Sequence, residues 1–197
     1  MLSRVSIEVP QGLTVGLGGP SGCGKSTLAR VLSLLLRPLS GGVSLEGTAV
    51  TRWRQRAPRR LRTRVALLYQ QPRTAVDPRL TLRQIISEPP AAAGRPAPSL
   101  VEELAAEVGL TGDLLTRRPH EVSDGQLQRA CLARALTLEP KYLICDEMTT
   151  MLDASTQAHL VAVVRSYQAR TGAGVLAISH DQVLLDRWAD SAVSWPT

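Results

Sequence analysis

A glycine-rich turn between an apolar run and a helix-like run is the strongest constraint on how this chain can fold. The residues GGPSGCGKST occupy positions 18–27, and positions 19–26 fit the pattern G-x-x-x-x-G-K-[S/T]. The apolar run 14–17 precedes the turn, and the helix-like run 28–36 follows it. Glycines in such a turn let successive backbone N–H groups point at one anion. The pattern therefore predicts an α/β domain that binds a nucleotide through its phosphates.

Each part of this phosphate loop has a defined task. Lys25 can neutralise the charge of the terminal phosphates, and the Ser26 hydroxyl can hold Mg²⁺. The helix that follows presents its positive N-terminal end to the same anion. The predicted nucleotide-binding residues are Gly19, Pro20, Ser21, Gly22, Cys23, Gly24, Lys25, Ser26 and Thr27.

Apolar runs alternate with helical periodicity along the rest of the chain, which indicates a sheet flanked by helices. Predicted strands cover 5–9, 14–17, 43–46, 65–69, 142–145 and 175–178, and predicted helices cover 25–36, 81–87, 100–108, 123–138, 155–171 and 182–189. The region of about 72–138 is mostly helical, so we expect a helical subdomain inserted into one sheet domain that spans 1–197. Its Pro- and Ala-rich stretch 89–99 is expected to be a flexible loop.

The composition is that of an ordinary globular domain. The chain has 197 residues, of which 44% are hydrophobic and 20% charged, which suffices to bury a core. No apolar run reaches the roughly 18 residues of a membrane span, and the first ten residues do not resemble a signal peptide. The cysteines, Cys23, Cys131 and Cys145, lack metal-ligand spacing and are expected to be reduced thiols of a cytosolic protein.

Basic charge gathers in one stretch of the chain. The formal net charge is +6, and seven arginines fall between Arg52 and Arg64. Such a cluster fits either a nucleic-acid or phospholipid surface or a solvated loop. We favour the solvated loop, because Trp53 is the only aromatic residue within 52–64 and no recognition motif accompanies it.

Two acidic residues close the apolar run YLICDE at 142–147. A buried strand would deliver Asp146 rigidly to the mouth of the site, where its carboxylate can orient Mg²⁺. Glu147 would point to the other side and polarise an attacking water. The run is a weak signal by itself and becomes a strong one beside the phosphate loop.

The segment PHEVSDGQLQRACLARAL at 119–136 resembles the signature of ABC-type ATPases, LSGGQ followed by a helix that contains Gln-Arg. Further motifs stand in the family's order: YQQP with Gln70, the strand with Asp146 and Glu147, LDAST with Asp153, and ISHD with His180. The resemblance covers nearly the whole chain. It implies a P-loop NTPase fold, an ABC ATPase core with a mixed, mainly parallel sheet flanked by helices and an inserted helical signature subdomain.

Within the signature, Ser123 can cap a helix whose N-terminus, with the Gly125 amide, forms a second anion site. The resemblance implies that two cassettes pair head to tail, with ATP and Mg²⁺ held between the phosphate loop of one and the signature of the other. It assigns Ser123, Asp124, Gly125 and Gln126 to the partner's ATP, Asp153 to the dimer loop, Ser26, Gln70 and Asp146 to the metal, and Glu147, His180 and Gln70 to hydrolysis.

A finer resemblance points to one branch of this family. The segment 71–89, QPRTAVDPRLTLRQIISEP, is similar to the Q-loop region of oligopeptide, dipeptide and nickel importers. It implies an ATP-hydrolysing subunit at the cytoplasmic face of the cell membrane, with a second ATPase subunit, identical or different, and membrane permease subunits as partners. No nucleic-acid partner is expected. The alternatives are an ABC ATPase that acts on nucleic acid and a catalytically weak regulatory module.

The chain departs from the family pattern at several places. Asp124 replaces the first signature glycine, and a carboxylate aimed at a phosphate would cost on the order of 3 kcal/mol at about 5 Å. Aimed outward in the first helical turn it would instead gain about 0.3–1 kcal/mol, so we favour that pose and expect Asp124→Gly to change the ATPase rate less than about tenfold. Met148 and Met151 replace a proline and a small residue, which should alter loop stiffness more than chemistry.

The segment before the phosphate loop also lacks the aromatic residue that stacks on adenine in the family, since the first aromatic residue is Trp53. We therefore expect either a truncated or misassigned start or weaker adenine binding. By analogy with stacked bases, worth about 1–3 kcal/mol, ATP binding would weaken roughly ten- to a hundredfold.

Overall fold

The computed structural model describes residues 5–148 and 152–195. These residues divide into two compact units. The first comprises 5–67, 141–147 and 172–195, and the second comprises 68–140, 148 and 152–171. The first unit carries the phosphate loop, and the second carries the signature segment.

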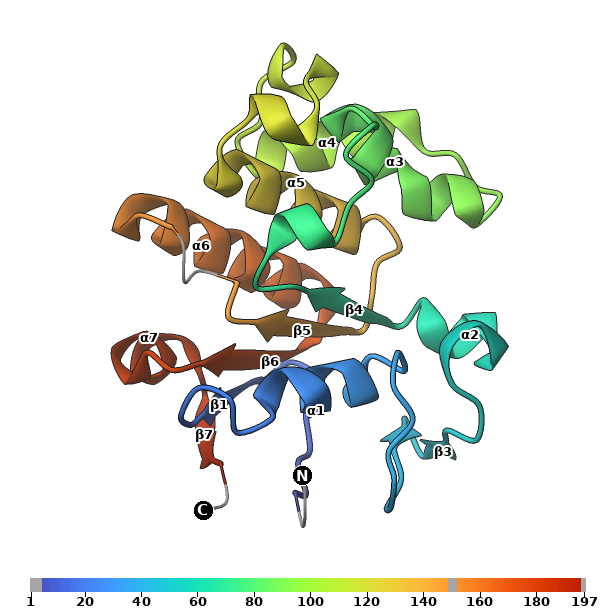
Figure 1. Ribbon diagram of the computed structural model, residues 1–197, viewed down its shortest axis with the longest axis vertical. Coiled ribbons are helices and arrows are strands. Elements are labelled where there is room, and N and C mark those ends of the chain that lie inside the picture. Colours follow the sequence, from blue (N-terminus) through green and yellow to red (C-terminus); the bar gives the residue numbers. More distant parts are fainter. Residues whose placement is uncertain (1–4, 149–151, 196–197) are drawn as a thin grey trace. The chain divides into compact units, whose positions relative to one another are not determined.

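A five-stranded sheet organises the first unit (Figure 1). Its strands run in the order β4-β5-β6-β1-β7 and are β4 (Val65–Leu68), β5 (Tyr142–Asp146), β6 (Gly174–Ser179), β1 (Thr14–Gly18) and β7 (Ser191–Ser194). The pairings of β5 with β6, of β6 with β1 and of β1 with β7 are parallel. Because parallel strands end at one edge of a sheet, the residues that follow β1, β5 and β6 gather at that edge.

The helices α1 (Lys25–Leu32) and α7 (Gln182–Trp188) pack on this sheet, α1 against β5 and α7 against β1 and β6. The prediction of a helix over 25–36 is too long. The Ser33 hydroxyl donates a hydrogen bond to the Ala29 carbonyl, and Leu34 turns to a left-handed φ of 63°. That turn places the Leu34 side chain in a second apolar cluster with Leu45 and Leu61, so packing ends the helix early.

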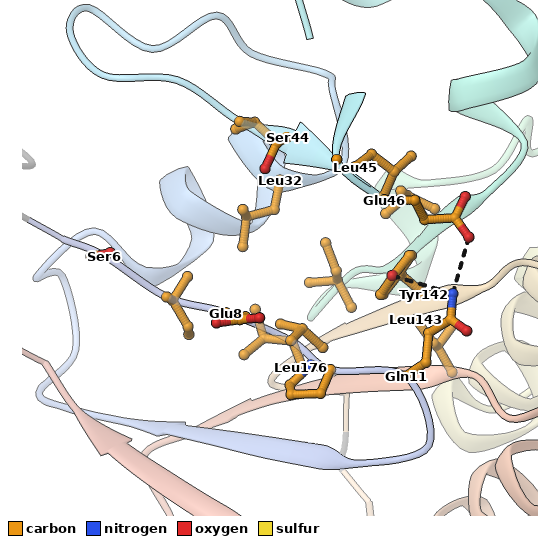
Figure 2. A pocket seen from close by; sticks show the side chains of 17 residues that line it. Ser6, Glu8, Gln11, Leu32, Ser44, Leu45, Glu46, Tyr142, Leu143 and Leu176 are labelled. Carbon is orange, nitrogen blue, oxygen red and sulfur yellow. Dashed lines mark hydrogen bonds between the residues drawn. The ribbon is translucent and has the colours of Figure 1, made fainter. Parts of the chain in front are cut away.

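The predicted strand at 5–9 is wrong, although its apolar periodicity is real. Ile7 and Val9 pack on the core cluster around Leu176, but within the part of the chain that the structure describes, residues 5–9 belong to no strand. The segment borders instead a cavity of about 650 Å³ whose far side is the short strand β2 (Ser44–Leu45) (Figure 2). The Gln11 amide crosses one end and donates to Glu46 Oε1 at 3.0 Å. The alternation of apolar residues thus predicted which side chains are buried. It could not predict whether a neighbouring strand pairs with this segment.

Short elements in the first unit also lie outside the prediction. They are β3 (Thr48–Ala49), the 3₁₀ turn η1 (Arg54–Arg56), the helix α2 (Arg59–Arg62) and the edge strand β7. The predicted strand at 43–46 is confirmed as the shorter β2, which pairs with β3 in an antiparallel hairpin. All four residues of β7 are exposed, so no apolar pattern marks it. Within the arginine-rich stretch 52–64, Trp53 is partly buried and packs against the Leu34 cluster.

The second unit is helical (Figure 1). It contains η2 (Pro72–Thr74), α3 (Leu82–Ala92), α4 (Pro98–Glu107), η3 (Leu114–Thr116), η4 (Pro119–Glu121), α5 (Asp124–Leu136) and α6 (Ala154–Thr171). The helix α5 packs against both α3 and α4 through fully buried residues such as Leu127 and Leu132. Among the described residues, no helix of either unit is long and apolar enough to cross a membrane.

The expected loop at 89–99 is helical in its first part. The helix α3 continues through Pro89 and Pro90 and ends at Ala92, and Gly94, two residues later, has a φ of +68°. Prolines remove two backbone donors there, but Ile85, Ile86 and Pro90 are buried, and this packing outweighs the local preference.

Candidate functional site

The phosphate loop connects β1 to α1 at the carboxyl edge of the sheet. Gly22 and Gly24 have φ values of 79° and 113°, which a side chain would strain, so these two glycines are required by the backbone. Gly24 is the N-cap of α1, and no side chain caps that end. The first N–H groups of α1 are thus directed into the loop, where an anion can accept them.

Lys25 lies inside this loop with only 4% of its surface exposed. Its Nζ donates to the carbonyls of Gly19 and Pro20, both at 2.8 Å, and lies 3.8 Å from Glu147 Oε1. A phosphate oxygen would take the place of these acceptors with a charge-assisted bond. The loop therefore holds a buried cation ready for an anionic group.

Ser26 and Asp146 form the predicted metal pair within the first unit. The Ser26 hydroxyl donates to Asp146 Oδ1 at 3.1 Å, and the Asp146 carboxylate is 5% exposed. A hydroxyl and a carboxylate side by side are the oxygen donors that Mg²⁺ takes with phosphate oxygens, so the residues fit that ion. Gln70, the third predicted ligand, belongs to the second unit, and its role at the metal stays a prediction.

The surroundings of Asp146 disfavour the ionised form of its carboxyl group. Burial raises the pKa of the Asp146 carboxyl, the hydrogen bond from Ser26 opposes this, and the Glu147 carboxylate raises the pKa further. A carboxyl whose pKa is raised on folding destabilises the folded state once it ionises, so its contribution worsens as pH rises through that pKa. A divalent cation bound there would stabilise the ionised carboxylate.

We therefore expect Asp146→Asn to raise the thermal midpoint of the nucleotide-free chain at pH 7. The gain should shrink as pH falls toward 3.8, the ordinary aspartate value, because the wild-type carboxyl then becomes protonated. Asp153→Asn is the matched control. Hydrogen bonds from Thr156 lower the pKa of Asp153, so its charge stabilises the fold and the midpoint should fall. Calorimetric scans between pH 5 and pH 7 check both signs, and a lower midpoint for Asp146→Asn would contradict the burial argument.

Glu147 and His180 meet at the same edge of the sheet. Glu147 follows β5 in a left-handed conformation, with a φ of 47°, and its amide donates to the Ile178 carbonyl at 3.0 Å. Its Oε2 lies 3.5 Å from Nδ1 of His180, which follows β6. The Glu147 side chain is 11% exposed and thus partly shielded from water, whereas His180 is 47% exposed. A carboxylate between a buried ammonium and an exposed imidazole suits a proton acceptor for an incoming water.

The signature turn in the second unit forms a complete helix cap, as predicted for Ser123. The Gln126 amide donates to Ser123 Oγ at 3.2 Å, and the Ser123 amide donates to Gln126 Oε1 at 3.0 Å. The amides of Asp124 and Gly125 take no part in this capping box and stand at the first turn of α5. Such N–H groups can bind an anion, and the second anion site at this turn stays a prediction.

The Asp124 carboxylate at this helix end is bound by an arginine side chain. Its Oδ1 accepts a hydrogen bond from Nε of Arg73 at 2.7 Å, and 49% of the side chain is exposed. Sequence reasoning assigned no role to Arg73, because 51 positions separate the two residues and no local pattern joins them. The segment 71–89, which resembles the Q-loop region, contains three arginines, and nothing in its pattern distinguishes Arg73 from Arg79 and Arg83.

Asp153 begins the helix α6 in the second unit. Its carboxylate accepts bonds from the Thr156 amide at 2.9 Å and from the Thr156 hydroxyl at 2.8 Å. Its role in a dimer loop remains a prediction. Met148 is buried at 4% exposure, and Met151 lies outside the described residues.

A second residue that sequence reasoning missed is Trp195, which follows β7. The Trp195 amide donates to the Gly18 carbonyl at 2.9 Å, and a Cβ placed on Gly19 would lie 2.7 Å from Trp195 Cβ. Packing against Trp195 therefore requires glycine at position 19. The Trp195 backbone and Cβ thus pack against the start of the phosphate loop, just after an edge strand that the apolar pattern does not reveal.

Comparison with known proteins places this geometry in a family. The family model for ABC transporters matches residues 2–150. A probable peptide ABC transporter ATP-binding protein of Sinorhizobium fredii is 40% identical over 186 residues, which are 92% of this chain and 53% of that protein. The nickel import ATP-binding protein NikE of Escherichia coli is 38% identical over 196 residues, 95% of this chain and 72% of that protein. The oligopeptide transport protein OppF of Salmonella typhimurium is 36% identical and is covered to 57%.

Solved structures agree on the fold. The dimeric ATP-binding cassette MJ0796, bound to ADP and phosphate, superposes with a TM-score of 0.87 at 24% identity, covering 98% of this chain and 85% of that one. The cassette cbiO1 of Clostridium perfringens, part of the transporter complex cbiONQ, gives a TM-score of 0.81. The chain spans about half the length of the peptide transporter relatives. The match over residues 2–150 and the identity to NikE show that this chain belongs to the ABC transporter family of ATP-binding proteins.

Proposed function

We propose that this chain is the ATP-hydrolysing subunit of a membrane importer for peptides or nickel. The observation that carries the proposal is the meeting of Lys25, Glu147 and His180 after β1, β5 and β6 at one edge of the sheet. The relatives named for peptide and nickel import support the cargo class. The relatives reported above give no support to an ATPase that acts on nucleic acid.

Each residue has a role in this proposal. Lys25 binds the terminal phosphates, and Ser26 and Asp146, with Gln70, would hold Mg²⁺, which would supply positive charge to neutralise the phosphate oxygens. Glu147 accepts a proton from the attacking water, and His180 contacts the terminal phosphate and keeps the carboxylate in place.

Two such cassettes would pair head to tail, and the signature turn at Ser123 would close each site from the other subunit. The partners would be this second ATPase, identical or different, and permease subunits that hold the complex at the cytoplasmic face of the membrane. The cassette MJ0796, which shares this fold, is a dimer in a state that follows hydrolysis, and this supports the pairing.

Co-isolation tests this assignment. The tagged chain should purify from mild-detergent extracts of its own membranes together with integral membrane subunits, and ATP turnover should be higher in that complex than in the free chain. Retention on DNA that is lost at higher salt, without membrane subunits, would favour the nucleic-acid alternative.

A thiol reagent gives a second test of the nucleotide site. Cys131 is 7% exposed and Cys145 is 1% exposed, and burial raises the pKa of Cys131 to about 11 and the pKa of Cys145 further. Cys23 lies in the phosphate loop and is partly exposed. We expect N-ethylmaleimide to modify Cys23 alone, to abolish ATP turnover, and to be slowed by ATP.

The control for this test is Cys23→Ser, which should remain active and become resistant to the reagent. Mass spectrometry of the modified chain identifies the thiol. Equal labelling with and without ATP would contradict nucleotide binding at this loop.

A further inference from the structure

We propose that Arg73 is a positioning residue for the signature: it acts as the counter-ion that holds the Asp124 carboxylate beside α5 and so makes the Ser123–Gly125 turn compatible with a terminal phosphate. This inference rests on the proposed function, in which a second cassette brings that phosphate to the turn. Nothing in the resemblance assigns a task to Arg73, and Asp124 is a departure from the family pattern.

The guanidinium of Arg73 is fixed on three sides. Its Nε donates to Asp124 Oδ1 at 2.7 Å, its Nη1 to the Pro119 carbonyl at 2.6 Å, and its Nη2 to the Val122 carbonyl at 3.0 Å. The two carbonyls belong to the residues just before the capping box. The planar guanidinium therefore binds both the backbone that leads into the turn and the Asp124 side chain.

The backbone that carries Arg73 is itself fastened to α5. The side-chain amide of Gln128 donates to the Tyr69 carbonyl at 3.2 Å, and Arg134 Nη1 donates to the Ala75 carbonyl at 2.7 Å. These bonds lie on either side of Arg73 in the sequence. Arg73 consequently stands at a fixed distance from the first turn of α5, so its charge is preorganised.

The turn needs such a counter-ion because a phosphate and the Asp124 carboxylate repel each other at close range. Close approach to the turn is indicated by Gly125. Its φ is outside the left-handed region, and an added Cβ would make only ordinary contacts, 3.5 Å to Leu152 Cδ2 and 3.6 Å to Thr156 Cγ2. Among the residues that the structure describes, neither the backbone nor the packing around Gly125 explains a glycine, whereas a group that arrives from outside does.

The test uses the Glu147→Gln background, in which slow hydrolysis should let an ATP-bound pair accumulate, and measures pairing by analytical ultracentrifugation. Arg73→Met should weaken ATP-driven pairing about tenfold, the scale of one charge interaction at a surface. Arg73→Lys should lie between Arg73→Met and the parent, because the charge remains while the fork of donors to the two carbonyls is lost. Adding Asp124→Gly to Arg73→Met should restore pairing to within about threefold of the parent. The deficit of Arg73→Met should shrink between about 0.1 M and 1 M salt, since the Debye length falls from ~10 Å to ~3 Å.

Arg79→Met is the matched control, since Arg79 pairs with Asp77 in the same segment at 2.7 Å and lies away from the turn. It should leave pairing unchanged, and ATP binding to dilute monomer should be the same in all variants. The inference would be overturned if Arg73→Met paired as well as the parent, or if Arg79→Met lost as much pairing as Arg73→Met. It would also be overturned if the deficit of Arg73→Met were not rescued by Asp124→Gly or did not change with salt concentration. Failure of the Glu147→Gln parent to pair in ATP, in solution and in the solubilised complex, would overturn the proposed function and this inference with it.

Discussion

Glu147→Gln should lower steady-state ATP turnover at least about a hundredfold while ATP binding is retained, because an amide cannot accept the proton of the attacking water. The substitution keeps the size of the side chain, which lies between Lys25 and His180 at 3.8 Å and 3.5 Å. Phosphate release under saturating ATP and equilibrium binding of labelled ATP give the two quantities separately.

Glu103→Gln, an exposed change on α4, is the control and should leave both quantities unchanged. Residual turnover of Glu147→Gln above about a tenth of wild type would place the proton acceptor elsewhere. Absence of turnover in the wild-type chain, even with membrane subunits, would instead favour the regulatory alternative.

Lys25→Met should weaken ATP binding by about a hundredfold or more, the scale of one to two charge-assisted hydrogen bonds. The substitution removes a buried cation and leaves the Gly19 and Pro20 carbonyls without the donor that now binds both. Because such carbonyls cost stability when unpaired, the thermal midpoint of the nucleotide-free chain should fall as well. Titration calorimetry with ATP measures the affinity, and a thermal scan measures the midpoint.

Lys141→Met is the natural control, since Lys141 is the only other lysine in the sequence. Lys141 pairs with Glu46 at 2.7 Å and is 47% exposed, so its loss should change ATP affinity less than about twofold. Similar losses for both variants would mean that net charge, and not the position of Lys25 in the loop, governs binding.

The sequence was most informative where chemistry and local conformation coincide. The phosphate loop needs Gly22 and Gly24 for their positive φ, and Ser123 begins its helix through a cap that the residues themselves encode. Such features depend on neighbours in the sequence, so a pattern can predict them. The same holds for the strand that ends at Asp146.

The remaining features depend on partners that are distant in the sequence. The run 5–9 has strand periodicity but no ladder partner, and β7 has a ladder partner but no apolar periodicity. The helix α3 continues through two prolines because its buried apolar face packs against its surroundings. The helix α1 ends early because the Leu34 side chain packs into a second apolar cluster. The ion pair of Arg73 and Asp124 is of the same kind, since no local pattern announces either partner.

The central claim is that a triphosphate is enclosed by the Lys25 loop of one cassette and the Ser123 turn of another. An experimental structure of the assembled Glu147→Gln complex with ATP and Mg²⁺ tests it most directly. We expect Ser123 Oγ and the Gly125 amide within hydrogen-bonding distance, about 2.7–3.2 Å, of the terminal phosphate held by the other cassette's loop. A structure in which Ser123 faces no triphosphate while Lys25 binds one would contradict the claim.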